Sequence, residues 1–490
     1  MIAPRFTPDE LAAATGGRWT GTPPASIEGV STDTRTIGPG SLFVALHGER
    51  FDAHAFLADA AAKGAAAAVV SQEWIAKDSV RPERLEPALP ERRPRDAGPE
   101  SKDGGGAESK GPLLVVPDTL AALGAIARHH RLRFRIPLVG VTGSNGKTTT
   151  REMIAAILAT RGKVLKTEGN LNNEVGLPLT LLGLDPSHQA AVIEMGMSHP
   201  GEIARLAAIA VPQVGVVTLA APAHLEGLGT VEAVADAKAE LYGGLPEGGI
   251  AIANADDARM LRRAQASGRR MITFSATKGR RGDVVVTQIV SQGEGGLRFV
   301  LGVGNREVPV HIPALVGAHN AANAAAAAAA AIALGCTDRE IARGLADVRP
   351  VGRRLRLDRL PSGLLLVDDC YNANPASMSA ALRTLLDLAA GGARPVAVLG
   401  DMLELGGFEA EAHRAVGEEA ARTGVRVLAA FGPRVRAAAE AARAAGLEAF
   451  HTEELDALVH WAKATLQPTD VLLVKGSRGM KLERLVEALR

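Results

Sequence analysis

The chain of 490 residues contains only two cysteines, Cys336 and Cys370. Two thiols are too few for a disulfide framework or a structural zinc site, so we expect a reducing, cytoplasmic environment. Aromatic residues are also scarce, at 3% of the sequence, whereas alanine and arginine are abundant. We interpret this bias as compositional drift without functional meaning.

Net charge and long apolar stretches are lacking as well. The formal net charge of +1 argues against a protein held to nucleic acid by bulk charge and leaves a local basic patch as the alternative. The longest apolar run, at 324–334, is mostly alanine and is shorter than the roughly 20 residues that span a bilayer. No basic segment followed by an apolar one opens the sequence, so we expect no secretory signal. We therefore expect neither a nucleic-acid partner nor membrane insertion, and we take a monomer as the simplest state.

The length of the chain predicts several domains. A typical domain has roughly 100–200 residues, which suggests about three domains here. Residues 77–112 are rich in proline, glycine and charge and nearly lack bulky apolar side chains. This segment cannot bury enough surface to offset its ordering entropy, so we interpret it as a flexible linker or surface insertion. The predicted order is an N-terminal domain at 1–76, this linker, a central domain at 113–351 and a C-terminal domain at 352–490.

Short apolar runs alternate with helix-compatible segments through all three parts. Strands that alternate with helices of this length imply an α/β protein with parallel sheets and right-handed crossovers. The four strand–helix repeats after residue 351 predict a Rossmann-like C-terminal domain. Residues 283–310 differ, because apolar and polar residues alternate there between glycine-rich turns. We expect antiparallel strands attached to the central domain at this point.

A glycine-rich turn, GVTGSNGKTT at 140–149, lies between a predicted strand and a predicted helix. Glycines let backbone amides point at phosphate oxygens, and the helix N-terminus adds partial positive charge. Lys147 can reach the β- and γ-phosphates, and the Thr148 hydroxyl can bind Mg²⁺. The spacing departs from the usual P-loop, since Val141 stands where the first glycine would be and Gly140 lies one residue earlier. A tight turn with a chance Gly-Lys-Thr is the alternative reading.

The strand before this turn and the helix after it favour an ATP or GTP site. We therefore expect the central domain to be a P-loop, ATPase-like domain built on a parallel sheet. The residues expected to contact the nucleotide here are Thr142, Gly143, Ser144, Asn145, Gly146, Lys147, Thr148 and Thr149.

In the form GVTGSNGKTTT, the turn resembles that of the Mur ligase family, the ATP-dependent amide ligases of peptidoglycan precursor synthesis. Similar blocks cover almost the whole chain outside the linker: TEGNLNNEVGLPLTLL (167–182), IEMGMSHPGEI (193–203), AHLEGLGTVEAVADAKAEL (223–241), GAHNAANAAAA (317–327), DDCYNANPASM (368–378), GDMLELG (400–406) and VKGSRGMKLE (474–483). The last three, with NLNNEVG, are most similar to the members that add D-alanyl-D-alanine to UDP-N-acetylmuramoyl-tripeptide. The resemblance implies this reaction, with ATP and Mg²⁺, through an acyl phosphate.

The resemblance also implies a metal and catalytic set. Glu194 ends an apolar strand, and in the family it is a Mg²⁺ ligand together with Thr148; a surface glutamate is the alternative. His224 follows the next strand and matches a second ligand. Lys238, in a helical stretch, reads on its own as a solvated lysine, but the matching family lysine is carbamylated by CO₂ and becomes an anionic ligand. The implied catalytic residues are Lys147, Glu194, His224 and Lys238.

Further nucleotide contacts follow from the same resemblance. Asn320 and Asn323 lie one helical turn apart, and the family uses this block for the adenine; helix capping by Asn320 is the alternative. The doublet Arg353–Arg354 matches an arginine at the domain junction, and we favour Arg354. Asp369 is expected to face the ATP from the C-terminal domain.

The remaining expected contacts are with the substrates. Candidates for the tripeptide and the dipeptide follow strand ends or belong to the matching blocks, namely Asn170, Asn172, Asn173, Tyr371, Asn372, Asn374, Lys475, Ser477 and Arg478. Some of these could equally be turn residues or surface charges. In the N-terminal block, the expected uridine and diphosphate contacts are Ser31, Thr32, Asp33 and Arg35. Asp52-Ala53-His54 departs from the Asp-Gly-His of the family.

Two other functions are compatible with the phosphate turn. One is a different Mur ligase or a folylpolyglutamate synthase-like enzyme, which would share the phosphate and metal site and take another acceptor. The other is a nucleotide-binding scaffold without catalysis. A complete set of Lys147, Thr148, Glu194, His224 and Lys238 argues against the scaffold, because binding alone does not need two metal positions.

Overall fold

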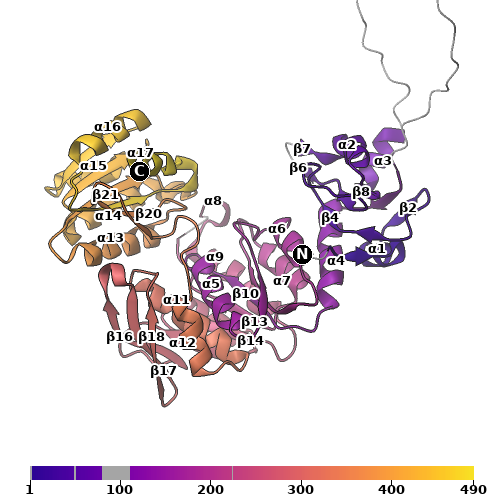
Figure 1. The fold of residues 1–490 in the computed structure, drawn as a ribbon, viewed down its shortest axis with the longest axis horizontal. Coiled ribbons are helices and arrows are strands. Elements are labelled where there is room, and N and C mark those ends of the chain that lie inside the picture. The colour runs from indigo at the N-terminus through magenta and orange to yellow at the C-terminus, as the bar shows by residue number, and fades with distance from the viewer. Residues whose placement is uncertain (1–2, 49–50, 80–110, 223–224) are drawn as a thin grey trace, which may run out of the picture. The chain divides into compact units, whose positions relative to one another are not determined.

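The computed structural model describes residues 3–48, 51–79, 111–222 and 225–490, and these form two compact units. The first unit comprises residues through Arg135 together with Glu174–Pro186, and the second comprises Ile136–Asn173 and Ser187–Arg490 (Figure 1). His224 and most of the segment predicted as a linker lie outside the described residues.

The first unit is built on a five-stranded sheet. Its strands, in spatial order, are β2 (Arg18–Thr20), β9 (Leu113–Val116), β8 (Ala67–Ser71), β5 (Leu42–Val44) and β4 (Val30–Ser31). Shorter pairs are β1 (Arg5–Phe6) with β3 (Ile27–Glu28) and β6 (His47–Gly48) with β7 (Phe51–Asp52). Its helices are α1 (Pro8–Thr15), η1 (Ala53–Phe56), α2 (Leu57–Ala62), α3 (Gln72–Ser79), α4 (Thr119–Leu132) and α6 (Gly176–Leu181).

The position of β9 differs from the sequence-based expectation. This strand begins at residue 113 and pairs in parallel with β8, so it completes the N-terminal sheet. Leu114 is fully buried there. The domain break expected at residue 113 therefore does not coincide with the break between the two units. An apolar run predicts a strand, but it does not indicate which sheet the strand joins.

The central sheet of the second unit has nine strands. Its order is β11 (Lys163–Lys166), β12 (His188–Glu194), β10 (Leu138–Thr142), β13 (Val214–Val217), β14 (Ile250–Asn254), β15 (Arg270–Ser275), β16 (Val284–Ser291), β17 (Leu297–Val303) and β18 (Arg306–Ile312). Strands β10–β15 run parallel, as predicted. The expected antiparallel segment is formed by β16–β18, and it continues the same sheet because β16 pairs with β15.

Helices cover both faces of this sheet. One face packs on α5 (Lys147–Ala159), α11 (His319–Ala333) and α12 (Asp338–Ala346) through a single apolar cluster. The other face carries α7 (Glu202–Ala210) and α9 (Val231–Gly243), and α8 (Leu225–Leu228) and α10 (Ala258–Ala266) lie beside α9. The alanine run of α11 is buried in this cluster, because small side chains let the helix approach the sheet closely.

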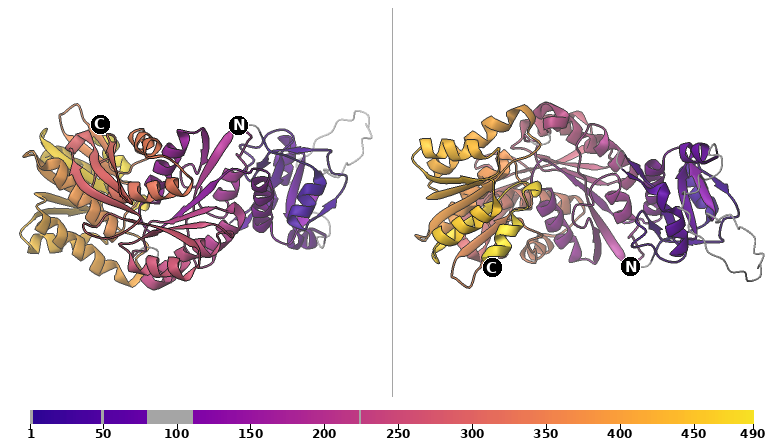
Figure 2. Two further views of the ribbon diagram at one scale, coloured as in Figure 1. Left: turned by 90° about the horizontal axis from the view of Figure 1, so that it is seen from below. Right: turned by 90° about the horizontal axis from the view of Figure 1, so that it is seen from above.

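The C-terminal sheet has six strands, in the order β19 (Arg356–Arg359), β20 (Leu365–Asp369), β24 (Asp470–Lys475), β21 (Arg394–Gly400), β22 (Val427–Phe431) and β23 (Glu448–Thr452). All except β19 run parallel. Successive residues of β20 alternate between two apolar clusters, so both faces are covered, as Figure 2 shows. The covering helices are α13 (Pro375–Ala389), α14 (Glu409–Thr423) and α15 (Arg436–Ala444) on one face, and α16 (Leu455–Thr465) and α17 (Glu483–Leu489) on the other.

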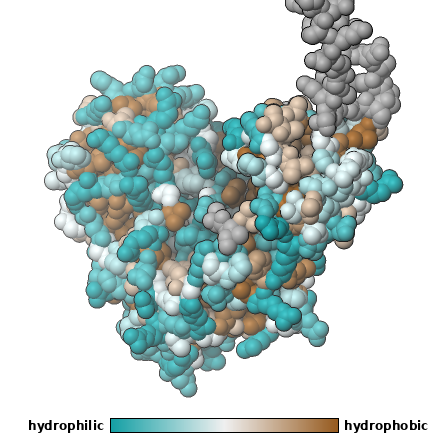
Figure 3. Space-filling model, turned by 45° about the vertical axis from the view of Figure 1, so that its right-hand side comes forward, coloured by the Kyte–Doolittle hydropathy of each residue, from teal (hydrophilic) through white to brown (hydrophobic). Residues whose placement is uncertain are grey.

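The predicted α/β class with parallel sheets and a Rossmann-like C-terminal part is thus confirmed. Sequence patterns missed the short edge strands β19 and β23, and also the single-turn helices η2 (Gly293–Gly295), η3 (Gly406–Phe408) and η4 (Arg478–Met480). On the face shown in Figure 3, hydrophobic residues are scattered among hydrophilic ones. Within the described ranges, no helix is both long enough and apolar enough to cross a membrane.

Candidate functional site

The phosphate turn joins β10 to α5, and two of its glycines are required by close approaches. Gly143 has φ 147°, and a Cβ there would lie 1.8 Å from the Thr218 hydroxyl oxygen. Gly146 has φ 78°, and its Cβ would lie 2.3 Å from Asn323 Oδ1. Other residues would be strained and would clash, so the glycines set the path of the turn.

Hydrogen bonds fasten the turn to the segment after β13. Ser144 Oγ donates to the carbonyl of Ala221 and accepts from its N–H, both at 2.9 Å. The Thr218 hydroxyl donates to the Asn145 carbonyl at 2.5 Å. Lys147 Nζ donates to the Gly143 carbonyl at 2.7 Å, so its ammonium lies over the turn. The turn thus presents one cation beside its backbone amides, an arrangement that suits a phosphate chain.

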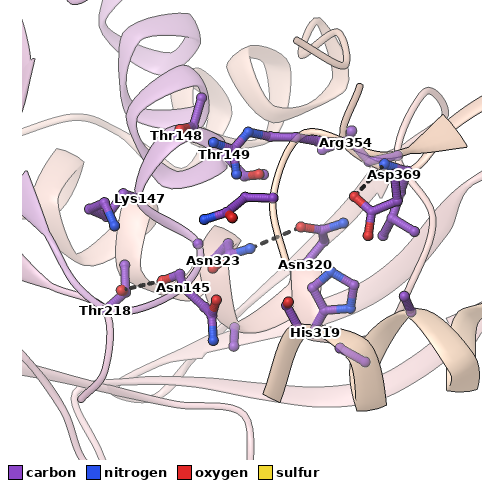
Figure 4. Close-up of a pocket in the computed structure, with 18 of the residues that line it drawn as sticks. Asn145, Lys147, Thr148, Thr149, Thr218, His319, Asn320, Asn323, Arg354 and Asp369 are labelled. Carbon is purple, nitrogen blue, oxygen red and sulfur yellow. Dashed lines mark hydrogen bonds between the residues drawn. The ribbon is translucent and has the colours of Figure 1, made fainter. Parts of the chain in front are cut away.

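The turn forms one wall of a pocket of about 270 Å³ within the second unit (Figure 4). Most of the predicted nucleotide and acceptor residues line it: Ser144, Asn145, Gly146, Lys147, Thr148, Thr149, Asn320, Asn323, Arg354, Asp369, Tyr371, Asn372, Asn374 and Lys475. The structure thus brings together residues separated by more than three hundred positions. Among the described residues of the second unit, the predicted ones that do not line it are Thr142, Gly143, Asn170, Asn172, Asn173, Glu194, Lys238, Ser477 and Arg478.

The amides of Asn320 and Asn323 are partly used within the protein. Asn323 Nδ2 donates to Asn320 Oδ1 at 2.9 Å, and Asn320 Nδ2 donates to the Val316 carbonyl at 2.7 Å. The Thr150 hydroxyl approaches Asn323 Oδ1 at 3.4 Å. Asn320 is buried, whereas Asn323 is half-buried at the pocket wall. Asn323 is therefore the better placed of the two for a ligand, with Asn320 holding it.

The two arginines of the doublet differ in their contacts. Arg353 pairs with Asp368 at 3.0 Å and with Glu487 at 2.9 Å, and it does not line the pocket. Arg354 lines the pocket, and its guanidinium carbon lies 4.3 Å from the centre of the Tyr371 ring. The geometry agrees with the preference for Arg354, since a stacked guanidinium keeps its N–H groups available for an anion.

Glu194, at the end of β12, lies next to the phosphate turn and is buried. Its Oε2 accepts from the Thr148 hydroxyl at 2.9 Å and from Arg151 Nη1 at 3.1 Å, and its Oε1 accepts from Asn172 Nδ2 at 2.9 Å. The alternative of a surface glutamate is excluded. The pair of Thr148 and Glu194 supplies hydroxyl and carboxylate oxygens, which suit Mg²⁺.

Lys238 is also buried, at 2% exposure, so the solvated helix lysine is excluded. Burial lowers the pKa of the Lys238 amine well below its usual range, and the positive charge of Lys147 adds to this shift. Among the described residues, no carboxylate forms an ion pair with Lys238. Burial also lowers the pKa of Lys147; the charge of Glu194 opposes this shift and that of Arg354 adds to it. The buried amine of Lys238 therefore lies beside Lys147 without a carboxylate partner of its own among the described residues.

The ends of β20 and β24 bring their predicted residues together. Lys475, which is buried, donates to Asp369 Oδ2 at 2.7 Å and to the Asn372 carbonyl at 3.0 Å. Lys475 is thus not a surface charge. The Ser477 hydroxyl accepts from the Leu403 N–H at 3.0 Å, which links the segment after β24 to the segment after β21.

The predicted contacts outside the pocket have mixed surroundings. Arg478 lies outside the pocket, with its guanidinium carbon 5.3 Å from the centre of the Tyr371 ring. Asn170 and Asn173 are exposed.

The predicted uridine and diphosphate contacts lie in the first unit. Hydrogen bonds from Arg35 hold the pKa of Asp33 there at about 2. Ser31 ends β4, and Thr32, Asp33 and Arg35 lie in the turn that follows, where Ser31 Oγ accepts from the Asp33 N–H.

Several pocket residues were not predicted. His319 projects from the start of α11, and Thr218 holds the turn. One part of the lining is apolar and includes Phe274, Leu315 and Val348. His319 stands in the quoted GAHNAAN block and could have been noticed there; the apolar residues carry no local signal. Arg151, the partner of Glu194, was also missed.

Three family models match most of the chain. The description "Mur ligase middle domain" matches residues 141–331, "Mur ligase, glutamate ligase domain" matches 352–478, and "Mur ligase family, catalytic domain" matches 26–97. These segments include the phosphate turn, β12 with Glu194, α9 with Lys238 and the C-terminal sheet.

Curated and solved relatives are similar over nearly their full lengths. The UDP-N-acetylmuramoyl-tripeptide–D-alanyl-D-alanine ligase of Escherichia coli K12 is 39% identical, over 95% of this chain and 94% of that protein. The crystal structure of MurF from Acinetobacter baumannii has a TM-score of 0.85 at 33% identity, covering 100% of this chain and 99% of the other. The MurF ligase of Thermotoga maritima, solved in complex with ADP, has a TM-score of 0.76 at 27% identity, covering 94% and 96%.

Proposed function

Because the chain belongs to the Mur ligase family, we propose that it is an ATP-dependent ligase of peptidoglycan precursor synthesis. Its proposed substrates are UDP-N-acetylmuramoyl-tripeptide and D-alanyl-D-alanine, the pair in the names of its relatives. The observation that carries the proposal is the buried group around the phosphate turn. There Thr148 meets Glu194 at 2.9 Å, and the side chain of Lys238 is buried, at 2% exposure.

The chemistry joins a carboxylate to an amine, which is uphill in water. The terminal carboxylate of the tripeptide attacks the γ-phosphorus of ATP, giving an acyl phosphate and ADP. The dipeptide amine then attacks the acyl carbon, and phosphate leaves as the amide bond forms. Negative charge builds up on phosphoryl oxygens in the first step, so cations must converge on them.

The residues of the turn would bind and orient ATP. Its backbone amides and Lys147 would hold the phosphates. The apolar lining of Phe274, Leu315 and Val348 suits a purine ring, and Asn323 would supply polar contacts to its edge. Arg354, stacked on Tyr371, would meet the phosphate chain or the acyl phosphate, and the Asp369–Lys475 pair would orient the acceptor side.

The oxygen donors at the turn fit Mg²⁺. Thr148 and Glu194 are buried and in contact, so they would hold the ion, with His224 as a further proposed ligand outside the described residues. When bound, Mg²⁺ neutralises charge on the transferred phosphoryl group. Lys238 as an ammonium does not fit a metal site. As a carbamate, formed when its neutral amine adds CO₂ and loses a proton, it would supply oxygen ligands and a negative charge.

An assay of phosphate release tests the reaction. We expect release that depends on both UDP-N-acetylmuramoyl-tripeptide and D-alanyl-D-alanine, and its loss in Lys147→Ala. Release with folate and glutamate instead would identify the other acceptor class. ADP binding without release under any of these conditions would support a scaffold. The proposed compartment, the cytoplasm, is where both substrates and ATP would be available.

The carbamate has its own test. Protein equilibrated with ¹³C-bicarbonate should give a carbamate carbon resonance that is missing in Lys238→Ala. Short carboxylic acids should partly restore activity to Lys238→Ala by replacing the missing anion. An unmodified lysine in the labelled protein, together with an active Lys238→Ala variant, would exclude the carbamate and leave the ligase proposal intact.

A further inference from the structure

Arg151 lies on the helix that follows the phosphate turn, three residues after Thr148, and only 1% of it is exposed. Its guanidinium reaches two carboxylates. Nη1 donates to Glu194 Oε2 at 3.1 Å, and Nε and Nη2 donate to Glu152 Oε1 at 3.1 and 2.6 Å. A buried arginine is tolerated only when its charge and N–H groups are matched in this way.

The carboxylate of Glu194 is held by donors from two other elements. Arg151 and Thr148 come from α5, Asn172 comes from the loop after β11, and Glu194 itself ends β12. The Glu194 N–H also donates to the Thr167 hydroxyl at 2.9 Å. Both oxygens and the backbone are therefore fixed, which leaves the carboxylate little freedom to turn.

Charge balance makes Arg151 the central member of this group. Glu152, which lines the nucleotide pocket, also accepts from Lys166 through its other oxygen. Lys166 is 42% exposed on its side chain, whereas Arg151 is buried between the two glutamates. Among the described residues, Arg151 is the cation that hydrogen-bonds to both carboxylates. Without it, two nearly buried carboxylates would lose their shared counter-charge.

We infer that Arg151 is a positioning residue, which holds the Glu194 carboxylate in the orientation needed for Mg²⁺. The inference rests on the proposed metal site at Thr148 and Glu194. An arginine suits this role because its planar fork offers separate N–H groups to two acceptors, while a lysine has one nitrogen. Partners that orient a metal ligand contribute typically about 10–100-fold to metal affinity, although they never touch the metal.

The test is the Mg²⁺ dependence of ADP binding, measured by calorimetry in the full chain without turnover. Arg151→Lys keeps the charge but cannot bridge both glutamates. We expect its half-saturating Mg²⁺ concentration to rise about tenfold, with ADP affinity in EDTA unchanged. Arg161→Lys is the matched control, since Arg161 follows the same helix and pairs with Glu340 at 2.8 Å, away from the pocket. It should leave the Mg²⁺ dependence as in the wild type.

Two variants distinguish an error in the role of Arg151 from an error in the proposed metal site. Glu194→Gln should raise the half-saturating Mg²⁺ concentration strongly; if it does not, the proposed site itself is wrong. If Glu194→Gln has this effect and Arg151→Lys does not, only the role of Arg151 is overturned. Should Arg151→Lys fail to fold, Asn172→Ser removes a neutral donor from the other oxygen of Glu194. A rise in the Mg²⁺ requirement of that variant supports positioning by the surrounding donors, and an unchanged requirement contradicts it.

Discussion

Asn145 of the phosphate turn and Asn374 at the start of α13 donate amide hydrogen bonds to each other, at 3.1 and 2.7 Å. Asn374 Oδ1 also accepts the Ser377 N–H at 2.9 Å and so caps α13. One side chain therefore joins the cap of a C-terminal helix to the turn that would bind phosphate. Asn374 was expected to contact substrate; its oxygen is already used twice within the protein.

We predict that breaking this amide pair weakens nucleotide binding. Asn374→Ser keeps an N-cap, because serine caps helices well, but it cannot make the reciprocal pair. ADP affinity should fall several-fold, in line with the about 1 kcal/mol of a typical hydrogen bond. Calorimetry on Asn145→Ala, Asn374→Ser and the double variant would measure the coupling.

The ADP affinity of the double variant distinguishes one shared effect from two independent effects. If the two residues act through their mutual contact, it should bind ADP little worse than either single variant. Additive losses would show that each residue acts separately. Thr337→Ser, at the N-cap of α12, is the control for a conservative cap change and should leave ADP affinity unaltered.

A second prediction concerns the path of the phosphate turn. Gly146→Ala would place a methyl group 2.3 Å from Asn323 Oδ1 at a residue with φ 78°, so the turn must shift. We expect at least about a tenfold loss of ADP affinity, since a small displacement of the amides weakens every phosphate contact. Gly248→Ala has nearly the same φ, 77°, with nothing within 4 Å, and it should cost stability without affecting ADP. Equal binding by both variants would contradict the steric argument.

Much of the site could be predicted because it follows from local patterns. A strand, a glycine-rich turn and a helix in succession define the phosphate site wherever the sheet lies. Glu194 could be placed for a similar reason: the carboxyl ends of parallel strands meet at one edge, and β10 and β12 are direct neighbours. These inferences needed the order of elements along the chain and no distant contact.

The remaining features depend on contacts that local patterns do not encode. Asn145 and Asn374 are 229 positions apart, and nothing at either position indicates the other. In the sequence, Arg151 resembles an ordinary charged residue of an amphipathic helix. Only its contact with Glu194 of β12 in the folded chain indicates a role. Strand β9 has the apolar pattern of any buried strand, and only its pairing with β8 assigns it to the first unit. In each case, tertiary packing decides the role.

A third prediction is a dependence of stability on pH. The Arg161 guanidinium, with the backbone and hydroxyl of Thr337, lowers the pKa of Glu340 from 4.5 to about 2. A carboxyl with a lowered pKa stabilises the folded state fully above pH 4.5, and this contribution is lost as the pH falls toward 2. Glu340→Gln should therefore lower Tm at neutral pH, and the difference from wild type should shrink across that window. A difference that stays constant with pH would exclude the charge of Glu340 as the cause.

The last prediction concerns the packing of α12 against α5, the helix that begins at the phosphate turn. Helix α12 lies so close to α5 that a Cβ on Gly344 would be 2.4 Å from the Cα of Ile157. The backbone of α5 cannot move aside easily, because its side chains are buried in the central cluster. Gly344→Ala should therefore lower the free energy of unfolding by about 1–3 kcal/mol, although alanine favours helices. Gly243→Ala, at the end of α9 with nothing within 4 Å, should instead be neutral or stabilising. Urea unfolding of the two variants gives the comparison.

Because α5 begins at the phosphate turn, the same substitution should also affect nucleotide binding. We expect ADP to bind Gly344→Ala more weakly than the wild type. Normal ADP affinity in a destabilised Gly344→Ala variant would show that the turn is held independently of α12.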